Sequence, residues 1–404
     1  MPMADKLEKL EDFREDLITC GHCMGCNVFN WWTLDKWVDC CPSGKKFGFI
    51  SYFAVGRVEL GRALLEEEIE PQDIEVLKKI AYACPTCGAC ILQCKEFKEM
   101  DNIAIIEALR AKMVELGYGP MPEHTKFAQA VDTVNNPYGE SHEKRFDWLP
   151  EGTNLDKDAE IGYFVGCTSA YREQELAKAT VKLLNKANIN FQLIGSDEYC
   201  CGSPLLRTGI RDKAIELAKH NVETIKKKGI KKVIFSCAGC YRTFKEDYPK
   251  IVGDLGFEVI HVTQFFEQML KEGLLKLKKS INKIITYHDP CHMGRHIHLT
   301  KKKIGVFDAP RNLLKAIPGI ELKEMVRIRE NAWCCGAGGG VKAAFKDLAL
   351  TTAIDRIEEA LSTGAEILVS ACPFCRRNLM DAINAKNASI DFKDIVELLE
   401  ESID

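Results

Sequence analysis

Residues 199–203 read Tyr-Cys-Cys-Gly-Ser, and the adjacent cysteine pair with its glycine returns as Cys334-Cys335-Gly336. A single cysteine precedes each pair at a distance, and a Cys-x-x-Cys motif follows it. The two resulting sets of five are Cys167, Cys200, Cys201, Cys237, Cys240 and Cys291, Cys334, Cys335, Cys372, Cys375. We infer a duplicated unit in which each half contributes one site.

The sequence around these sets alternates between short apolar runs and helical patterns. The predicted strands are Ile161–Val165, Phe191–Ile194, Lys232–Phe235, Phe257–Val262, Ile284–Tyr287 and Ile367–Val369, and the predicted helices include Gln174–Ala187, Lys213–Lys227 and Ala343–Leu361. This alternation indicates parallel sheets with covered faces. Four of the strands lead directly to Cys167, Cys237, Cys291 and Cys372. Ligand sites in open α/β sheets lie beyond the carboxyl ends of strands, so this placement suits a buried cofactor.

The chain up to Tyr118 is predicted to be helical and carries the remaining cysteines. Amphipathic periodicity predicts helices near Lys6–Leu17, Arg57–Ile69, Asp73–Ala81 and Ile103–Leu116. In two-cluster ferredoxins, three closely spaced cysteines hold one cubane and the fourth of the run serves the other cluster. By that analogy one cubane 4Fe–4S cluster has Cys20, Cys23, Cys26 and Cys94, and the other has Cys84, Cys87, Cys90 and Cys41. We favour Cys41 over Cys40 because Pro42 follows it.

Zinc is the alternative for these N-terminal cysteines. Zinc sites use separated pairs or histidine partners, whereas triplets at three-residue steps suit iron–sulfur clusters. The stretch between Cys26 and Cys40 carries Trp31, Trp32 and Trp37. We expect these rings to pack over a cluster, with partner docking as the alternative.

Composition excludes several classes of protein. The chain has 404 residues, 19 cysteines and a formal net charge of -4, so no basic field recruits nucleic acid. The charged N-terminus is unlike a signal peptide, and no stretch approaches the ~18 apolar residues of a membrane span. An odd cysteine count without a signal favours metal-bound thiolates in a reducing compartment. We expect a soluble cytoplasmic protein that meets a membrane only through a partner.

The motifs now support a resemblance that covers nearly the whole chain. The two five-cysteine sets resemble the paired CCG domains of heterodisulfide reductases, and the motif order is similar to that of the heterodisulfide reductase D subunits. The supporting segments are Val165–Thr168, Tyr199–Ser203, Arg207–Gly209, His220–Val222, Cys237–Cys240 and Tyr287–His296. The resemblance implies that each set holds a non-cubane 4Fe–4S cluster, and that a CoM-S-S-CoB type disulfide is cleaved between the two clusters. The long stretch before Cys40 departs from the family pattern, which leaves the partner surface open.

We therefore expect an α+β multidomain protein. An all-α ferredoxin-like domain at residues 1–118 precedes a linker at 119–157. Two α/β CCG domains with parallel sheets follow at 158–280 and 281–404.

Several residues beside the cysteines are candidates for further roles. His292 is placed to protonate a leaving thiolate, or to donate a hydrogen bond to cluster sulfur. Arg207 and Arg295 could bind a sulfonate or phosphate of the substrate, or offset cluster charge. The cofactor-binding candidates are Gly202, Gly336 and Gly338, which together with Gly339 and Gly340 let the backbone approach a cluster and offer it N–H groups. His288, His296 and His298 are interpreted as structural or surface groups.

The leading hypothesis is a catalytic subunit in which electrons enter at the cubanes and leave at the non-cubane pair. The alternative is a non-catalytic electron-transfer subunit of an anaerobic complex or of a lactate or glycolate dehydrogenase type flavoprotein. Either way the chain needs a redox partner subunit. That partner is a membrane cytochrome b, a flavin subunit or another iron–sulfur subunit.

Overall fold

The structure is a computed structural model that describes residues 7–28, 38–95, 98–299 and 304–403. Trp31, Trp32 and Trp37 lie outside the described residues. The N-terminal region is helical, as predicted. Its elements are η1 (Leu10–Phe13), α1 (Arg14–Ile18), η2 (Gly25–Asn27), α2 (Pro42–Phe47), η3 (Ile50–Tyr52), α3 (Ala54–Leu65), η4 (Pro71–Asp73), α4 (Ile74–Tyr82), α5 (Ala89–Lys95) and α6 (Asn102–Glu115).

Local sequence explains how the long helices of this region begin and pack. Asp101 caps α6, because its carboxylate accepts the backbone N–H groups of Ile103 and Ala104 at 3.1 Å each. Apolar side chains of α1, α3, α4 and α6 then form one buried cluster, which includes Leu17, Val58 and Leu109. Burying this shared face stabilises helices that would be marginal alone.

The segment at residues 119–157 contains ordered structure. It forms α7 (Pro122–Val134), with proline in the first turn, and the 3₁₀ helix η5 (His142–Phe146). Val131 and Trp148 are buried in the same hydrophobic core as the first sheet. This segment therefore packs as part of the body that carries the cysteine sets.

The first cysteine-rich half is a four-stranded parallel sheet in the order β2-β1-β3-β4. Its strands are β1 (Ile161–Phe164), β2 (Gln192–Leu193), β3 (Lys232–Phe235) and β4 (Glu258–His261). Its helical elements are α8 (Cys167–Tyr171), α9 (Gln174–Lys186), η6 (Gly195–Asp197), α10 (Ser203–Arg207), α11 (Arg211–Lys227), α12 (Ala238–Arg242), the π-helical turn η7 (Thr243–Asp247), α13 (Tyr248–Val252) and α14 (Val262–Lys271).

The second half repeats this topology, with order β6-β5-β7-β8 and all pairs parallel. Its strands are β5 (Lys283–Tyr287), β6 (Ile320–Leu322), β7 (Ile367–Ser370) and β8 (Asp391–Asp394). Its helical elements are α15 (Arg295–Leu299), α16 (Asp308–Ala316), η8 (Arg329–Asn331), α17 (Val341–Ala344), α18 (Lys346–Leu361), α19 (Pro373–Lys386) and α20 (Ile395–Ser402). The duplication and the parallel α/β fold class are confirmed.

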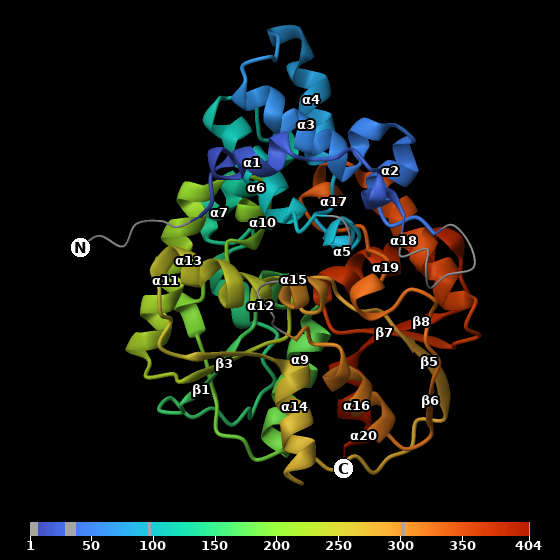
Figure 1. Cartoon of the computed structure of the whole chain (residues 1–404). Helices are drawn as coiled ribbons and strands as arrows, with labels where there is room; N and C mark the ends of the chain where they lie inside the picture. The colour runs from blue at the N-terminus through green and yellow to red at the C-terminus, as the bar shows by residue number, and fades with distance from the viewer. Residues whose placement is uncertain (1–6, 29–37, 96–97, 300–303, 404) are drawn as a thin grey trace.

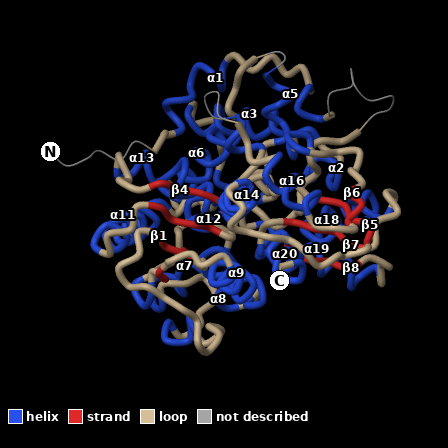
Figure 2. The backbone as a smooth tube through the Cα atoms, turned by 90° about the horizontal axis from the view of Figure 1, so that it is seen from below, coloured by secondary structure: helices blue, strands red, loops and turns tan. Residues whose placement is uncertain are grey.

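The two sheets lie side by side, with helices of both halves between them (Figure 2). Helix α9 packs against α20, and α14 packs against α16. The N-terminal helices lie above both sheets (Figure 1). Within the described ranges, none of the helices combines the length and apolar character needed to cross a bilayer.

Candidate metal centre

All ten cysteines of the two sets line one cavity of about 920 Å³. Their placement follows from the topology, because Cys167, Cys237, Cys291 and Cys372 come shortly after β1, β3, β5 and β7. Parallel strands present their carboxyl ends at the same edge of a sheet. Each Cys-Cys pair then approaches that edge from the loop before a short helix. None of the nineteen cysteines forms a disulfide, so all are available as ligands.

In the first half, backbone and side-chain donors surround the sulfur atoms. The N–H of Gly202 donates to Cys200 Sγ at 3.4 Å, and Gly202 has a left-handed φ of 78°. The thiol of Cys201 makes side-chain hydrogen bonds with Cys200 and Cys240. The Arg145 guanidinium lies 3.7 Å from Cys167 Sγ, and it forms a fully buried ion pair with Glu198. A backbone N–H beside a thiolate stabilises its charge, which is what a cluster ligand requires.

In the second half, Gly336 repeats the role of Gly202, with its N–H 3.2 Å from Cys334 Sγ. Hydrogen bonds from Cys334 and Cys375 hold the pKa of the Cys335 thiol well below its usual range. Hydrogen bonds from Cys237 and Cys375 likewise lower the pKa of Cys372. The Cys237–Cys372 contact joins the two sets, so the halves meet inside the cavity.

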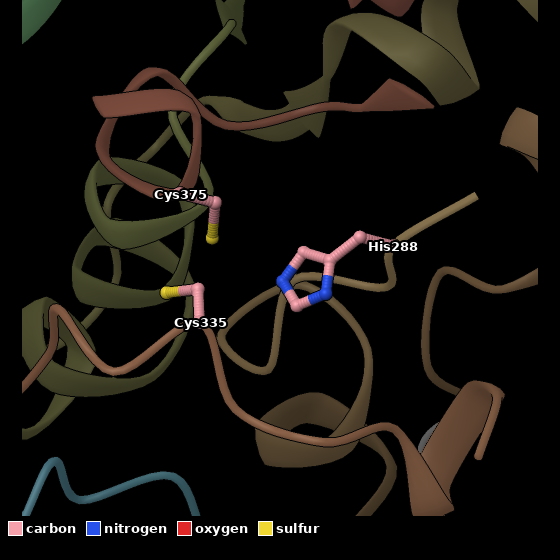
Figure 3. A group of neighbouring side chains, drawn as sticks. All are labelled: His288, Cys335 and Cys375. Carbon is pink, nitrogen blue, oxygen red and sulfur yellow. The ribbon is translucent and has the colours of Figure 1, made fainter. Parts of the chain in front are cut away.

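His288 is a residue of this site that sequence reasoning assigned to the structural or surface class. It follows β5 directly and is buried. Its ring points toward Cys335 and Cys375 (Figure 3), and one ligand atom from each of the three residues lies within 4.8 Å of the others. The only available signal was its position at the end of a predicted strand, three residues before Cys291.

The glycine-rich loop from Gly336 to Gly340 has a second use. A Cβ at Gly338 would lie 2.5 Å from the carbonyl oxygen of Pro85, and one at Gly339 would collide with the carbonyl of Cys84. Only glycine permits this approach. The loop therefore brings the N-terminal Cys84–Cys87 segment against the second half, in addition to the N–H that Gly336 offers to sulfur.

The N-terminal cysteines form two neighbouring groups. Cys20 and Cys23 are the nearest thiols that raise the pKa of Cys26 and of Cys94, although burial is the larger cause for both. Around Cys90 the corresponding neighbours are Cys87, Cys40, Cys84 and Cys26, again after burial. The division of these cysteines between two cubanes stays a prediction.

Cys40 and Cys41 have different surroundings. Cys41 caps α2, and its Sγ accepts the N–H of Gly44 at 3.3 Å. Cys40 Sγ donates to the carbonyl of Cys26 at 3.0 Å, and Cys41 Sγ also lies 3.6 Å from the carbonyl of Tyr52. Of the two sulfur atoms, that of Cys41 has the backbone N–H donor that suits a thiolate, and its role as the ligand stays a prediction.

One N-terminal thiol reaches the second half directly. Cys87 makes a side-chain hydrogen bond with Cys334, which is the main cause that lowers its pKa to about 6. Cys40, Cys87, Trp333 and Cys334 belong to one small buried cluster. The N-terminal cysteines are thus continuous with the second set.

The three predicted catalytic residues have different environments. His292 lines the cavity, and its Nε2 is buried with no hydrogen-bond partner among the described residues. Arg207 also lines the cavity, but its guanidinium donates to the carboxylates of Glu107 and Asp247. Arg295 is not a lining residue, and it donates to the carbonyls of Cys87, Glu330 and Ala332 at 2.6–2.9 Å. The arginines bond to protein groups, whereas His292 lines the cavity with its ring 4.5 Å from that of His296 and close to Cys291.

Arg110 on α6 is a residue that sequence reasoning missed. It is 0% exposed and donates to the carbonyls of Ala81 and Cys84 in its own region. It also donates to the carbonyl of Arg207 in the first half at 2.7 Å and to that of Gly339 in the second half at 2.9 Å. One guanidinium therefore joins all three parts of the molecule at the cavity.

Comparisons with known proteins agree with this geometry. A family model for the CCG cysteine-rich domain matches residues 161–245 and 285–380. The fold and the shared cavity define an iron–sulfur oxidoreductase with two CCG domains. Over 341 residues the chain is 45% identical to the D subunit of dihydromethanophenazine:CoB–CoM heterodisulfide reductase from Methanosarcina barkeri, in a match that covers 83% of this chain and 81% of that protein. The chain belongs to the family of heterodisulfide reductase D subunits, as the resemblance predicted.

More distant relatives extend the same class. The chain is 33% identical to the probable iron-sulfur-binding oxidoreductase FadF of Bacillus subtilis, over 85% of this chain and 48% of that protein. It is 30% identical to the B subunit of the fumarate reductase (CoM/CoB) of Methanothermobacter marburgensis, over 79% of this chain and 61% of that protein. A hypothetical protein from Helicobacter pylori shares the fold, with a TM-score of 0.58 at 10% identity over 86% of this chain and 68% of that one. The chain is thus an iron–sulfur-binding oxidoreductase subunit of a larger complex.

Proposed function

We propose that this chain is the disulfide-cleaving subunit of its complex. In this proposal the two five-cysteine sets hold non-cubane 4Fe–4S clusters, and the N-terminal groups hold two cubanes that deliver electrons. The observation that carries the proposal is the single cavity of about 920 Å³ lined by all ten cysteines of the two sets. A pure relay does not require two complete sets facing one open space.

The residues present fit such clusters. Free thiols, backbone N–H donors at Gly202 and Gly336, and buried surroundings are what iron–sulfur ligands need. The clusters would supply two electrons, one from each half. The overall reaction is RSSR′ + 2 e⁻ + 2 H⁺ → RSH + R′SH, with the electrons drawn from the redox partner subunit.

His292 is the residue we assign to proton delivery. Burial is the main cause that lowers its pKa to about 4, with the Arg207 charge adding to the effect and the Cys372 thiolate opposing it. The ring is therefore neutral near pH 7, so it would take up a proton from solvent as negative charge develops on the departing thiolate and pass that proton to the sulfur. No other histidine appears among the residues that line the cavity in the described parts of the chain.

The cavity also offers cationic groups to an anionic substrate. Lys126 of α7 and Lys346 of α18 line it, are exposed, and form no ion pair with any described residue. Since Arg207 and Arg295 are occupied by protein acceptors, we assign recognition of a sulfonate or phosphate to these lysines instead. The disulfide of coenzymes M and B carries such groups, and we propose this class of substrate.

The test is reduction of the mixed disulfide by anaerobically purified, iron-replete protein with reduced viologen as electron donor. We expect stoichiometric release of both thiols, and we expect His292→Phe to lower turnover about 100-fold with the iron content unchanged. Iron-replete protein that accepts electrons without releasing thiols would refute the catalytic role and leave the relay function. The partner is then identified by which class of protein, a cytochrome b, a flavoprotein or another iron–sulfur protein, reduces the chain in place of viologen.

A further inference from the structure

His288 occupies a position where the two halves differ. It lies three residues before Cys291, and the residue three positions before Cys167 is Phe164. Phe164 packs against Phe235 and Phe244 in an aromatic cluster. The second half has replaced an apolar ring by an imidazole, only 1% exposed, beside its cysteines.

Arg356 determines which nitrogen of His288 carries the proton. Its Nε donates to His288 Nδ1 at 3.1 Å, and its Nη1 is held by the carbonyl of Arg327 and the carboxylate of Glu359 at 2.9 Å each. Arginine stays protonated in proteins and has no acceptor atom. Nδ1 must therefore present its lone pair, so the ring is neutral and its proton is on Nε2.

The Nε2 atom of His288 is buried and is without an oxygen or nitrogen partner among the described residues, while a side-chain interaction with His288 contributes to the lowered pKa of Cys335. The ring edge that carries this atom points toward Cys335 and Cys375 (Figure 3). A buried N–H without a partner is costly, which indicates an acceptor nearby in the working protein. The sulfur atoms of Cys335 and Cys375 lie within 4.8 Å and become strong acceptors once the thiols are deprotonated by metal binding.

We propose that His288 Nε2–H donates to the thiolate sulfurs of Cys335 and Cys375, and that this raises the reduction potential of the cluster in the second half. The inference rests on the proposed function, in that these thiolates hold a cluster. Hydrogen bonds to ligand sulfur stabilise the added negative charge of the reduced state. His288 is a positioning residue, and Arg356 fixes its orientation.

The same geometry excludes His288 as an iron ligand. A histidine that binds a metal uses a free lone pair and donates its other ring N–H to an acceptor. Here the other nitrogen already accepts from Arg356, so Nε2 would bind metal only as an imidazolate. The histidine therefore serves the sulfur atoms rather than the metal.

The test is a redox titration of both non-cubane signals by electron paramagnetic resonance. His288→Phe copies the first half, and we expect it to lower the ratio of reduced to oxidised second-half cluster roughly tenfold at fixed potential, or about 59 mV for a one-electron couple. His288→Gln keeps an N–H donor and should return most of this shift. The first-half signal is the internal control and should not move.

A second readout begins with the wild-type protein. In protein labelled with ¹⁵N-histidine, we expect a weak nitrogen coupling at the second-half cluster, and His288→Gln, which keeps an N–H donor, assigns the coupling by removing it. A strong coupling would show that His288 is an iron ligand, and the absence of coupling would show that the hydrogen bond does not form. Either result overturns the inference. Because these measurements require only loaded clusters, they remain decisive if the protein proves to cleave no disulfide. Absence of non-cubane signals would instead refute the proposed clusters themselves.

Discussion

The two cysteine-rich halves share one sheet topology and one cysteine plan, yet they differ in what surrounds the sulfur atoms. The first half places the buried pair Arg145–Glu198 beside Cys167. The second half places His288 beside Cys335. The buried ion pair of this half, Arg311–Asp289, lies just after the end of β5. The two halves share the cysteine positions, whereas the charged and polar residues beside the sulfur atoms differ.

The N-terminal region increases this difference, because it contacts the two sets unequally. Cys87 makes a side-chain hydrogen bond with Cys334 of the second set, and the glycine-rich loop of the second half packs against the backbone of Cys84 and Pro85. In the first half, the side chains that meet α6 are those of Arg207 and its neighbours rather than a cysteine. The N-terminal cysteines therefore contact the second set and not the first among the described residues.

The largest effect is expected from removing one cysteine of each half. Cys201→Ser and Cys335→Ser exchange a thiolate for a poor ligand of iron. If the halves bind metal independently, each variant loses about a quarter of the total iron and all disulfide cleavage. Iron analysis after anaerobic purification checks this. Loss of half the iron in either variant would show that the Cys237–Cys372 contact makes the two sets one unit.

Cys40→Ser is the matched control, since Cys40 bonds to a carbonyl rather than accepting a backbone N–H. We expect it to retain full iron. A deficit in this variant would exchange the assignments of Cys40 and Cys41.

Arg110→Met should weaken both halves together. It leaves the carbonyls of Cys84, Arg207 and Gly339 buried without their donor. Disrupting a fully buried charged network typically costs about 3–5 kcal/mol of unfolding free energy. Urea denaturation measures the loss, and Arg62→Met on the exposed side of α3 should change stability little. Destabilisation confined to the N-terminal helices would show that Arg110 does not unite the halves.

Two further variants compare the buried ion pairs. Glu198→Gln leaves Arg145 without its buried carboxylate, at a cost of about 3 kcal/mol. Asp289→Asn should cost less, because Arg311 keeps its ion pair with Glu324. Glu198 also accepts the N–H groups of Val165 and Gly166 at 3.0 and 2.8 Å, so its loss should disturb the loop that carries Cys167. Urea denaturation measures the loss of stability, and the rate of iron release measures the disturbance of the loop that carries Cys167. Equal iron retention in the two variants would argue against separate roles for the pairs.

The smallest effect concerns the cavity lysines. Lys126→Glu and Lys346→Glu should each raise the KM for an anionic disulfide about threefold to tenfold at low salt, and less at high salt. Turnover at saturation should be unchanged, because neither side chain contacts a cysteine. Lys227→Glu is the control, because Lys227 is an exposed residue of α11 that does not line the cavity. A KM that is independent of salt would contradict an electrostatic role.

The sequence predicts most of the sheet structure, because short apolar runs between helical patterns are a local property. The two strands it does not predict, β6 and β8, lie at sheet edges and are short or polar, as in Asp391-Phe-Lys-Asp394. Ala343–Leu361 was expected as one helix, but the chain forms α17 and α18 with a break at Phe345. Helix α7 was hidden by the proline and asparagine residues around it.

The candidate site divides in a similar way. Cysteine positions at strand ends are readable from spacing, and the structure brings both sets together as expected. Arg110, Arg356 and Glu198 act through partners far along the chain, and no local pattern marks them. Arg207 and Arg295 stood out because they are close to cysteine motifs, and in the structure their side chains bond to protein groups. Their role beside a substrate or a cluster stays a prediction.

A single guanidinium touching three parts of the chain has a mechanical consequence. Arg110 donates to the carbonyls of Cys84, Arg207 and Gly339, which belong to the three parts of the chain. A tilt of the N-terminal region would therefore strain or move the backbone beside both cysteine sets. Docking of a partner on the distant helices would then be felt as a small displacement of the cavity wall. The side chain of Arg110 would thereby couple contact between subunits to the geometry of the cavity.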